Sequence, residues 1–503
     1  MNKSDIMTSR VSCIYRGFFM VFNSYSYIFI FLPLVVAGFH LLKRAKNPLI
    51  PKCFLLCASL FFYGLHNLKA LAVLCVSIVL NYLISLLCLK KKKPALILGI
   101  VLDLGVLVYC KYLLFFEGIS NSLFHTTFTF SSLILPLGIS FYTFSQIAYL
   151  SDCYKDPGNR CSFLDYAVFV SFFPKVTVGP IALSTEMVPE INRAIRKKID
   201  FDKWSKAMIC LSFGIAKKVL LADTLSKYVD WGYANIDALG TTNAFLVMLS
   251  YTLQIYFDFS GYCDMARAVC LFLGFDLVRN FDSPYRSLSI AEFWKRWHMS
   301  LTRFFRVYVY FPLGGNRKGK VRTYINHMIV FLLSGLWHGA SLNFLLWGAI
   351  HGAGIICSKL LKPFSVKWPK TLRFLLTFAF VNLTWVYFRA PDLTTAHAFF
   401  KELFTGGLVP INIEFIAAAT PAECNILQWL VMRFTTLSTY YTGMVMILSV
   451  LLFALLASIF MKNTDERTDS FRPSPKLAAA CTALLVMGIL SLSEISKFIY
   501  VNF

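Results

Sequence analysis

The chain has 503 residues, of which 57% are hydrophobic, 16% aromatic and only 15% charged, and its mean hydropathy is +0.63. This balance excludes an ordinary soluble enzyme or binding module and indicates a polytopic membrane protein. The formal net charge of +23 does not indicate a nucleic-acid surface, because the basic residues lie in short loops between apolar runs, as at 43–48 and 90–93. Such loops are typical of the cytoplasmic side of a membrane protein, which would place the N-terminus outside.

Apolar runs near the roughly 20 residues that cross a bilayer predict an all-α fold of about ten to thirteen membrane helices, some not fully spanning. Residues 1–19 precede them as an N-terminal extension that lacks the apolar core and cleavage site of a secretion signal. The predicted long segments are 27–43, 69–89, 95–115, 131–150, 243–259, 322–338, 341–361, 372–389, 443–462 and 476–492, and shorter or interrupted ones lie near 53–66, 164–183 and 206–222.

Neither an internal repeat nor a low-complexity linker is visible, which favours a single membrane domain from residue 20 to residue 503. We expect residues 404–440, which contain several glycines and prolines, to form an ordered excursion outside the membrane. The fourteen cysteines show no CxxC and no Cys/His metal spacing, so we expect them to be small core residues. We expect no metal site and no bound cofactor.

Residues 288–311, LSIAEFWKRWHMSLTRFFRVYVYF, have aromatic and basic side chains on opposite sides when they are placed at the helical period. This pattern predicts one amphipathic helix at the membrane interface. We expect Lys295, Arg296 and Arg303, on or near the basic face, to contact lipid headgroups or a phosphate-bearing donor. His298 lies on the aromatic face, where an ionisable ring is out of place.

The run LLSGLWHGASLNFLLWGAIHG, residues 332–352, contains two more histidines, His338 and His351, among apolar and small residues. The desolvation of a polar ring in hydrocarbon must be offset by a partner or by a use, so both rings and His298 are functional candidates. The alternative is that each ring only forms a hydrogen bond with a neighbouring carbonyl group.

Neighbouring residues in this run bear on the roles of His338 and His351. Trp337 and Asn343 lie close to His338 in the sequence and are candidate supporting residues. His351 lies beside Gly348 and Gly352, and this spacing of small residues more often marks tight helix packing in lipid. His351 is therefore a weaker candidate, in a supporting role.

The segment QIYFDFSGYCDMA, residues 254–266, places Asp258 and Asp264 in another apolar run. Carboxylates at such a depth orient a histidine or line a water-filled cavity. The alternative is that they satisfy a helix that is broken at Gly261. The basic segment GGNRKGK, residues 314–320, lacks the spacing of a phosphate-binding P-loop, which favours an interfacial loop.

Several long motifs resemble the membrane-bound O-acyltransferase family, and more narrowly its bacterial branch of alginate O-acetylation and teichoic acid D-alanyl transfer proteins. The resemblance extends from about Met20 to the closing FIYVNF, with a motif core at about 131–390. The motifs are LPLGISFYTFSQIAYLSDCYK at 135–155, FFPKVTVGP at 172–180, YFDFSGYCDMA at 256–266, FWKRWHMSLTRFFRVYVYFPLGGNRKG at 293–319 and GLWHGASLNFLLWGAIHG at 335–352. The chain departs from the relatives at Lys175 and Thr177, where they carry less polar residues.

The resemblance implies a bundle of membrane helices, with interfacial and re-entrant helices around a central tunnel. It also implies a transferase in which His338 is the active-site residue and His298 its second polar partner. The expected donor is a cytoplasmic thioester, acetyl-CoA, and the expected acceptor is an extracytoplasmic polysaccharide such as alginate. Acetylation would be direct or would pass through an esterase-like acetyltransferase partner, in the inner (cytoplasmic) membrane.

Three other functions remain open from the residues. D-alanyl transfer to teichoic acid-type polymers would require a docking surface for an acidic carrier protein, which the basic segment 288–311 does not exclude. A secondary transporter commonly shows two repeated halves with paired broken helices, and the sequence shows none. A structural subunit of an export complex would have little need for buried histidines.

Overall fold

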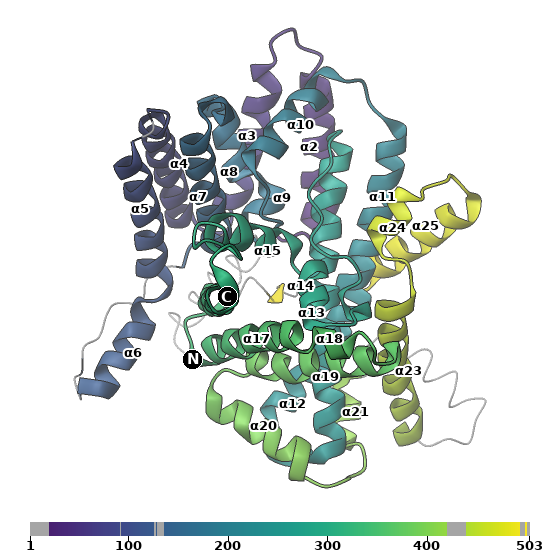
Figure 1. The fold of residues 1–503 in the computed structure, drawn as a ribbon. Coiled ribbons are helices and arrows are strands. Elements are labelled where there is room, and N and C mark those ends of the chain that lie inside the picture. The colour runs from purple at the N-terminus through teal and green to yellow at the C-terminus, as the bar shows by residue number, and fades with distance from the viewer. Residues whose placement is uncertain are drawn as a thin grey trace, which may run out of the picture. The chain divides into compact units, whose positions relative to one another are not determined.

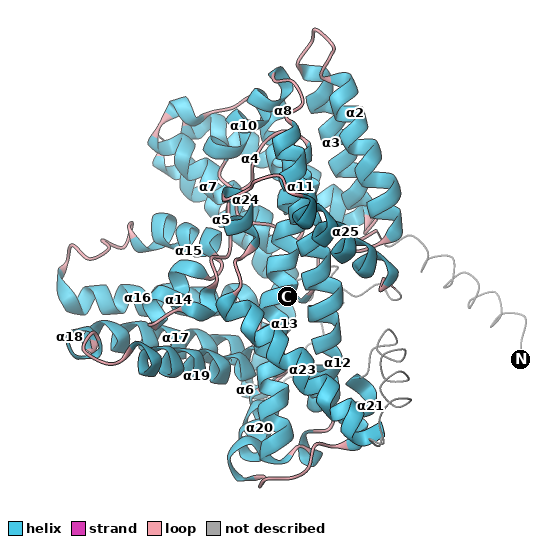
Figure 2. Cartoon of the chain, turned by 90° about the vertical axis from the view of Figure 1, so that its right-hand side faces the viewer, coloured by secondary structure: helices cyan, strands magenta, loops and turns pink. Residues whose placement is uncertain are grey.

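The computed structural model describes residues 20–90, 92–124, 127, 135–419, 439–492, 498 and 499. Helices are the only regular secondary structure in these residues (Figures 1 and 2). The chain divides into two compact units, one of Met1–Ala207, Val269–Leu277 and Leu492–Lys497 and the other of Met208–Ala268, Val278–Ser491 and Phe498–Phe503. The predicted extension at residues 1–19 lies outside the described residues, and the single membrane domain stays a prediction.

The first unit contains the N-terminal helices. In it α4, α5 and α7 pack side by side (Figure 1). Asn67 begins α4, because its side chain accepts hydrogen bonds from the backbone N–H groups of Lys69 and Ala70 at 2.8 and 3.0 Å. The elements are η1 (Tyr27–Phe31), α2 (Leu32–Leu42), α3 (Leu49–Gly64), α4 (Leu68–Cys88), α5 (Lys93–Lys111), α6 (Leu113–Phe124), α7 (Ile139–Lys155), α8 (Phe163–Ser171), α9 (Phe173–Val176), α10 (Ser184–Arg196) and the start of α11 (Phe201–Ile215).

The second unit contains every predicted site residue. Its helices α16, α17 and α19 run side by side (Figure 2). The elements are η3 (Ala216–Ala222), α12 (Asp223–Ala234), most of α13 (Gly240–Phe272), α14 (Ile290–Arg296), α15 (Met299–Phe305), η6 (Arg306–Tyr310), α16 (Gly319–His338), α17 (Leu342–Leu360), α18 (Lys362–Ser365), α19 (Lys370–Arg389), α20 (Leu393–Thr405), α21 (Ile413–Ala419), α23 (Thr439–Phe460), α24 (Thr464–Asp469) and α25 (Pro475–Leu490).

Glycines allow α16 and α17 to touch backbone to backbone. A Cβ atom on Gly335 would lie 2.2 Å from the carbonyl oxygen of Phe344, and one on Gly348 would lie 2.4 Å from that of Phe331. Real Cβ atoms do not approach oxygen so closely, so any larger residue would force the two helices apart. Small residues at the contact are the usual means of close helix packing in lipid.

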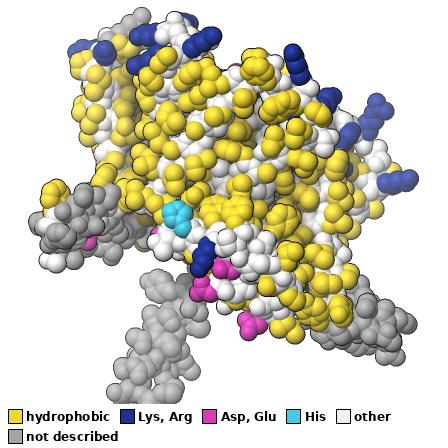
Figure 3. All heavy atoms as spheres, turned by 60° about the horizontal axis from the view of Figure 1, so that its bottom comes forward, with side chains coloured by type: hydrophobic (Ala, Val, Ile, Leu, Met, Phe, Trp, Pro, Cys, Tyr) yellow, Lys and Arg dark blue, Asp and Glu magenta, His cyan; other side chains and the backbone are white. Residues whose placement is uncertain are grey.

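Each predicted long apolar segment overlaps a helix of the structure, although residues 131–134 of one segment lie outside the described residues. Among the described helices, Leu68–Cys88, Lys93–Lys111, Lys370–Arg389 and Tyr440–Phe460 are long and apolar enough to cross a membrane alone. The helices at Tyr27–Leu42, Leu49–Gly64 and Pro475–Leu490 are apolar but shorter. Hydrophobic side chains cover most of the face shown in Figure 3, which suits a protein embedded in the membrane through several segments.

Two local predictions are wrong. Residues 288–311 do not form one helix, because the chain leaves the helical conformation at Trp297 and His298, between α14 and α15. The segment around Gly261 is not broken, since α13 continues from Gly240 to Phe272. There, a Cβ atom on Gly261 would lie 2.9 Å from the carbonyl oxygen of Gly214, so this glycine serves close packing within an intact helix.

The predicted excursion at residues 404–440 is described only in part. It contains the end of α20, the loop that follows and the short helix α21, while residues 420–438 lie outside the described residues.

Substitution of Gly348 by alanine tests the packing of α16 on α17. We expect Gly348→Ala to destabilise the protein by about 1–3 kcal/mol, because the methyl group overlaps a backbone oxygen that cannot move aside. The thermal midpoint of the purified protein in detergent, followed by size-exclusion chromatography, measures the effect. Gly105→Ala on α5 is the control, since a Cβ atom there would meet nothing within 4 Å; an equal midpoint in both variants would contradict the packing argument.

Candidate active site

His338 is enclosed by aromatic rings at the end of α16. It is the last residue of that helix and is 2% exposed. Its ring centroid lies 4.8 Å from that of Trp337, 5.2 Å from that of Trp347 on α17 and 5.0 Å from that of Phe388 on α19. At the following residue, Gly339, a Cβ atom would come within 2.1 Å of a phenylalanine ring. The absence of a side chain there lets the chain turn while the imidazole stays inside the enclosure.

His298 lies at the break between α14 and α15. It is fully buried, and its φ of 43° is in the left-handed region, which among the described non-glycine residues only Ser283 shares. Histidine tolerates this conformation better than most residues, and such strain clusters at functional sites. The ring centroid lies 4.8 Å from that of Phe259 and 5.9 Å from that of Trp337. Trp337 therefore contacts both predicted histidines.

Asn280 fixes the orientation of the His298 ring. Its Oδ1 atom accepts hydrogen bonds from the backbone N–H of Ser300 at 3.1 Å and from the Ser300 hydroxyl at 2.8 Å, and it lies 3.2 Å from His298 Nδ1. A backbone N–H can only donate, so the atom of Asn280 that faces it is the amide oxygen. His298 Nδ1 then carries the hydrogen in the neutral ring, which makes Nε2 the basic nitrogen.

His351 belongs to the same aromatic wall but has a different partner. Its Nδ1 atom accepts a hydrogen bond of 3.2 Å from the indole N–H of Trp294, and its ring centroid lies 4.7 Å from that of Trp347. Trp347 also contacts His338, so a single tryptophan joins the two rings. Tight packing at the neighbouring glycines is confirmed, since a Cβ atom on Gly352 would lie 2.9 Å from the sulfur of Met328. A supporting role for His351 stays a prediction.

Asp258 and Asp264 on α13 form ion pairs with consecutive lysines. Asp258 Oδ1 lies 2.7 Å from Lys218 Nζ, and Asp264 Oδ2 lies 2.7 Å from Lys217 Nζ. These four side chains are largely buried, and a buried charge is tolerated only when it is paired. Asp258 and Asp264 thus contact lysine, hydroxyl and backbone groups, and their predicted role of orienting a histidine gains no support from this geometry.

A short helix, α24, connects these ion pairs to the segment that carries Asn280. Thr464 donates a hydrogen bond of 2.6 Å to Asp264, and the Asn463 amide donates one of 2.9 Å to the hydroxyl of Ser283. Asp465 pairs with Arg267; burial raises the pKa of Asp465 to about 6, and the arginine opposes this shift. A polar cavity of about 20 Å³, enough for one water molecule, lies between Asp264 and Asn280.

Lys295, Arg296 and Arg303, the residues predicted to contact lipid headgroups or the donor, differ in their surroundings. Arg296 already forms ion pairs with Glu292 at 3.1 Å and Asp282 at 3.0 Å, whereas Lys295 is exposed beside a cavity. Arg303 is half-buried on α15. The Asn343 side chain donates a hydrogen bond of 2.8 Å to the backbone carbonyl of the residue after α19, so it ties α17 to α19 beside the enclosure.

Several residues of the site were not predicted from the sequence. Lys217 and Lys218 lie in the interrupted apolar run 206–222, and two lysines at such a depth signal that two carboxylates must pair with them. Asn280 lies outside any predicted helix, in a stretch without periodicity, so the sequence carries no signal for its contact with His298. Trp347 is one of many tryptophans in apolar runs, and its position between two histidines follows only from the packing of α16 on α17.

Comparison with known proteins gives consistent matches. The sequence profile of the membrane-bound O-acyltransferase family matches residues 153–395. The chain is 36% identical to a peptidoglycan O-acetyltransferase of Helicobacter pylori, over 99% of this chain and 100% of that protein. It is 38% identical to a probable alginate O-acetylase of Pseudomonas syringae pv. tomato, over 77% of this chain and 76% of that protein. A teichoic acid D-alanyltransferase of Bacillus subtilis is more distant, at 27% identity over 50% of this chain and 67% of that protein.

The helical apolar fold, the enclosed histidines and these similarities define a membrane-embedded acyltransferase. The chain belongs to the membrane-bound O-acyltransferase family. The predictions of the family, the all-α membrane fold and an O-acyltransferase are confirmed. The roles of the individual residues and the central tunnel stay predictions.

Replacement of Asn280 by leucine tests the assignment of the His298 tautomer. Asn280→Leu has a similar volume but offers no acceptor, so we expect His298 to leave the single Nδ1–H form. Solid-state nitrogen NMR of histidine-labelled protein in bilayers measures the change, and the spectrum of His298→Gln identifies the signal. Asn382→Leu is the control, because the Asn382 amide bonds to the backbone of its own helix; an unchanged His298 signal in Asn280→Leu would contradict the assignment.

Proposed function

We propose that the protein transfers acetyl groups from a cytoplasmic thioester, acetyl-CoA, for the O-acetylation of an extracytoplasmic glycan of the cell envelope. Two observations support this proposal: the aromatic enclosure of His338, and the near full-length similarity to a peptidoglycan O-acetyltransferase. The similarity to probable alginate O-acetylases supports acetyl as the transferred group. The proposed location is the inner (cytoplasmic) membrane, where a cytoplasmic donor and an extracytoplasmic acceptor lie on opposite sides of one protein.

His338 is the proposed general base. The acceptor hydroxyl oxygen attacks the thioester carbonyl carbon while a neutral imidazole nitrogen takes the hydroxyl proton. The new C–O bond forms, the C–S bond breaks, and the proton passes from the imidazolium to the departing thiolate. Atoms and charges balance without a bound cofactor, so acetyl-CoA is a substrate. Transfer of the acetyl group to the imidazole itself, followed by attack of the hydroxyl, uses the same ring.

His298 is the proposed partner of the acceptor hydroxyl. Because Asn280 holds the hydrogen on Nδ1, the neutral ring presents a lone pair at Nε2. A lone pair accepts a hydrogen bond from a hydroxyl but cannot donate one to a carbonyl oxygen. This tautomer favours orientation of the acceptor over stabilisation of the thioester oxygen, which only a protonated His298 could provide.

D-alanyl transfer is the competing function within the family. The teichoic acid D-alanyltransferases match only about half of this chain, at 27% identity, whereas the O-acetylating relatives match 77% or more at 36–38%. This difference favours acetyl transfer. An esterase-like acetyltransferase outside the membrane is a proposed partner, since the acetyl group reaches the polymer directly or through such a protein.

The variant His338→Ala tests the general base. We expect polymer acetylation to fall by at least a thousandfold, because loss of the proton acceptor removes the chemical step. Abundance in the membrane should stay near normal, since the change truncates one side chain in a wall of larger rings. Acetyl content of the glycan, normalised to protein amount, measures the effect. His397→Ala, at an exposed histidine of α20, is the control and should keep full activity. Full activity in His338→Ala would show that His338 takes no part in the reaction.

Two substitutions of His298 separate its backbone role from its chemistry. Asparagine tolerates the left-handed conformation, whereas alanine does not, so His298→Asn should keep the abundance of the protein better than His298→Ala. We expect both variants to lose activity by tenfold or more, since neither offers a basic nitrogen to the acceptor. Acetyl content and protein amount are measured together. Full activity in His298→Asn would show that only the backbone conformation at this position matters.

Donor use distinguishes acetyl from D-alanyl transfer. Purified protein in vesicles with the cytoplasmic face outward should consume externally added acetyl-CoA only when an acceptor hydroxyl or an acetyl-receiving partner is present. Release of free thiol measures the reaction, and the His338→Ala protein is the control. No use of acetyl-CoA, together with a requirement for a D-alanyl carrier protein, would overturn acetyl transfer. Uptake of an unmodified solute without thioester cleavage would instead show a transporter.

A further inference from the structure

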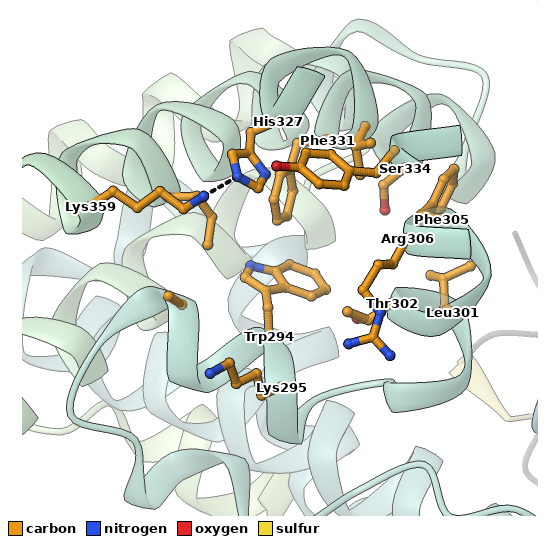
Figure 4. Close-up of a pocket in the computed structure, with 14 residues that line it drawn as sticks. Trp294, Lys295, Leu301, Thr302, Phe305, Arg306, His327, Phe331, Ser334 and Lys359 are labelled. Atoms are coloured by element: carbon orange, nitrogen blue, oxygen red, sulfur yellow. Dashed lines mark hydrogen bonds between the residues drawn. The ribbon is translucent and has the colours of Figure 1, made fainter. Parts of the chain in front are cut away.

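A half-open cavity of about 280 Å³ lies beside the candidate active site. It is formed by α14, α15, η6, α16 and α17, all in the second unit. Its interior is apolar, with walls that include Trp294, Leu301, Phe305, Phe331 and Ile355. Figure 4 shows Trp294 near the centre of these side chains, with Phe331 across from it.

Basic side chains surround this apolar interior. Lys295, Arg306 and Lys359 line the cavity and are exposed. Lys359 Nζ forms a hydrogen bond with the ring of His327, which also lines the cavity (Figure 4). In the described part of the chain, no ion pair joins any of these three cations to a carboxylate, and no carboxylate lines the cavity. By contrast, the adjacent Arg296 is paired twice.

We propose that this cavity binds an anionic phospholipid with a single phosphate group. The phosphate lies among Lys295, Arg306 and Lys359, where it supplies the negative charge that this part of the protein lacks. One acyl chain packs against the apolar wall that Trp294 and Phe331 form together, since their rings are in contact at 5.1 Å between centroids. An amphipathic ligand with a negative headgroup matches both parts of the cavity. Its hydrocarbon chain suits the apolar walls, and its headgroup suits the cations.

The lining favours a lipid chain over the arm of a thioester donor. The pantetheine arm of acetyl-CoA carries amide groups that need hydrogen-bond partners when they are buried. Besides the cations, the lining offers only the hydroxyl groups of Thr302, Tyr310 and Ser334 and the ring of His327. A hydrocarbon chain needs none, and its burial against these walls is favourable in proportion to the area removed from water.

The cavity also touches the residues that shape the active site. Trp294 lines the cavity and donates its indole hydrogen bond to His351. Ser334 lines it one helical turn before His338 on α16. A lipid chain against Trp294 would hold the wall formed with Trp347, which contacts His338. Bound lipid therefore stabilises the enclosure, independently of which acyl group the enzyme transfers.

Native mass spectrometry of the full-length protein, released from nanodiscs of phosphatidylglycerol and phosphatidylcholine, tests the site. We expect the wild-type protein to retain one phosphatidylglycerol in preference to phosphatidylcholine. Lys359→Gln and Arg306→Gln should each weaken this retention about fivefold. Val330→Phe fills the apolar part of the cavity without a change of charge and should weaken it as strongly. Arg322→Gln, at an exposed arginine of α16 outside the cavity, is the matched control and should have no effect.

The other outcomes overturn the proposal. Equal loss in Arg322→Gln would show general attraction of basic residues to anionic lipid. Loss in the charge variants but not in Val330→Phe would show a headgroup on the surface without a chain in the cavity. Displacement of phosphatidylglycerol by acetyl-CoA would assign the cavity to the thioester donor, and displacement by inorganic phosphate would assign it to a free anion. All variants are compared after size-exclusion chromatography, so that misfolded protein is not scored.

Discussion

Close contact between the backbones of α16 and α17 determines the geometry of the candidate site. Because Gly335 and Gly348 carry no side chains, the end of one helix meets the start of the next with no room for a larger residue. That contact places Trp347 against both His338 and His351. Without it, the histidine at the end of α16 would lose part of the aromatic wall that now excludes solvent. Gly335 and Gly348 are thus as much a part of the site as its histidines.

Charge is distributed unevenly around this site. The rings nearest His338 are aromatic and carry no net charge. Ion pairs lie elsewhere in the unit, as where Lys218 contacts both Asp258 at 2.7 Å and Asp223 at 2.9 Å. Lys295, Arg306 and Lys359 line the cavity beside the site and form no ion pair with a carboxylate of the described residues.

Sequence patterns predicted the helices well because the length and hydropathy of a membrane segment are local properties, as for the runs that became α4 and α5. The break at His298 was not predictable in this way, since the aromatic and basic faces of 288–311 fit an uninterrupted helix. What ends the helix is a contact distant in sequence, the bonds from Asn280 to Ser300 and His298. The lysine partners of the two aspartates were not predictable for the same reason, because they precede the aspartates by 40 and 47 positions.

The paired lysines have a consequence for biogenesis. Lys218 pairs with the nearby Asp223 at 2.9 Å as well as with Asp258, whereas Lys217 is synthesised 47 positions before its carboxylate, Asp264. Such a charge opposes insertion by about 2.5–3.5 kcal/mol at the middle of a helix. The ion pair of Lys217 therefore forms only after α13 has been synthesised, so the folding of η3 depends on that of α13.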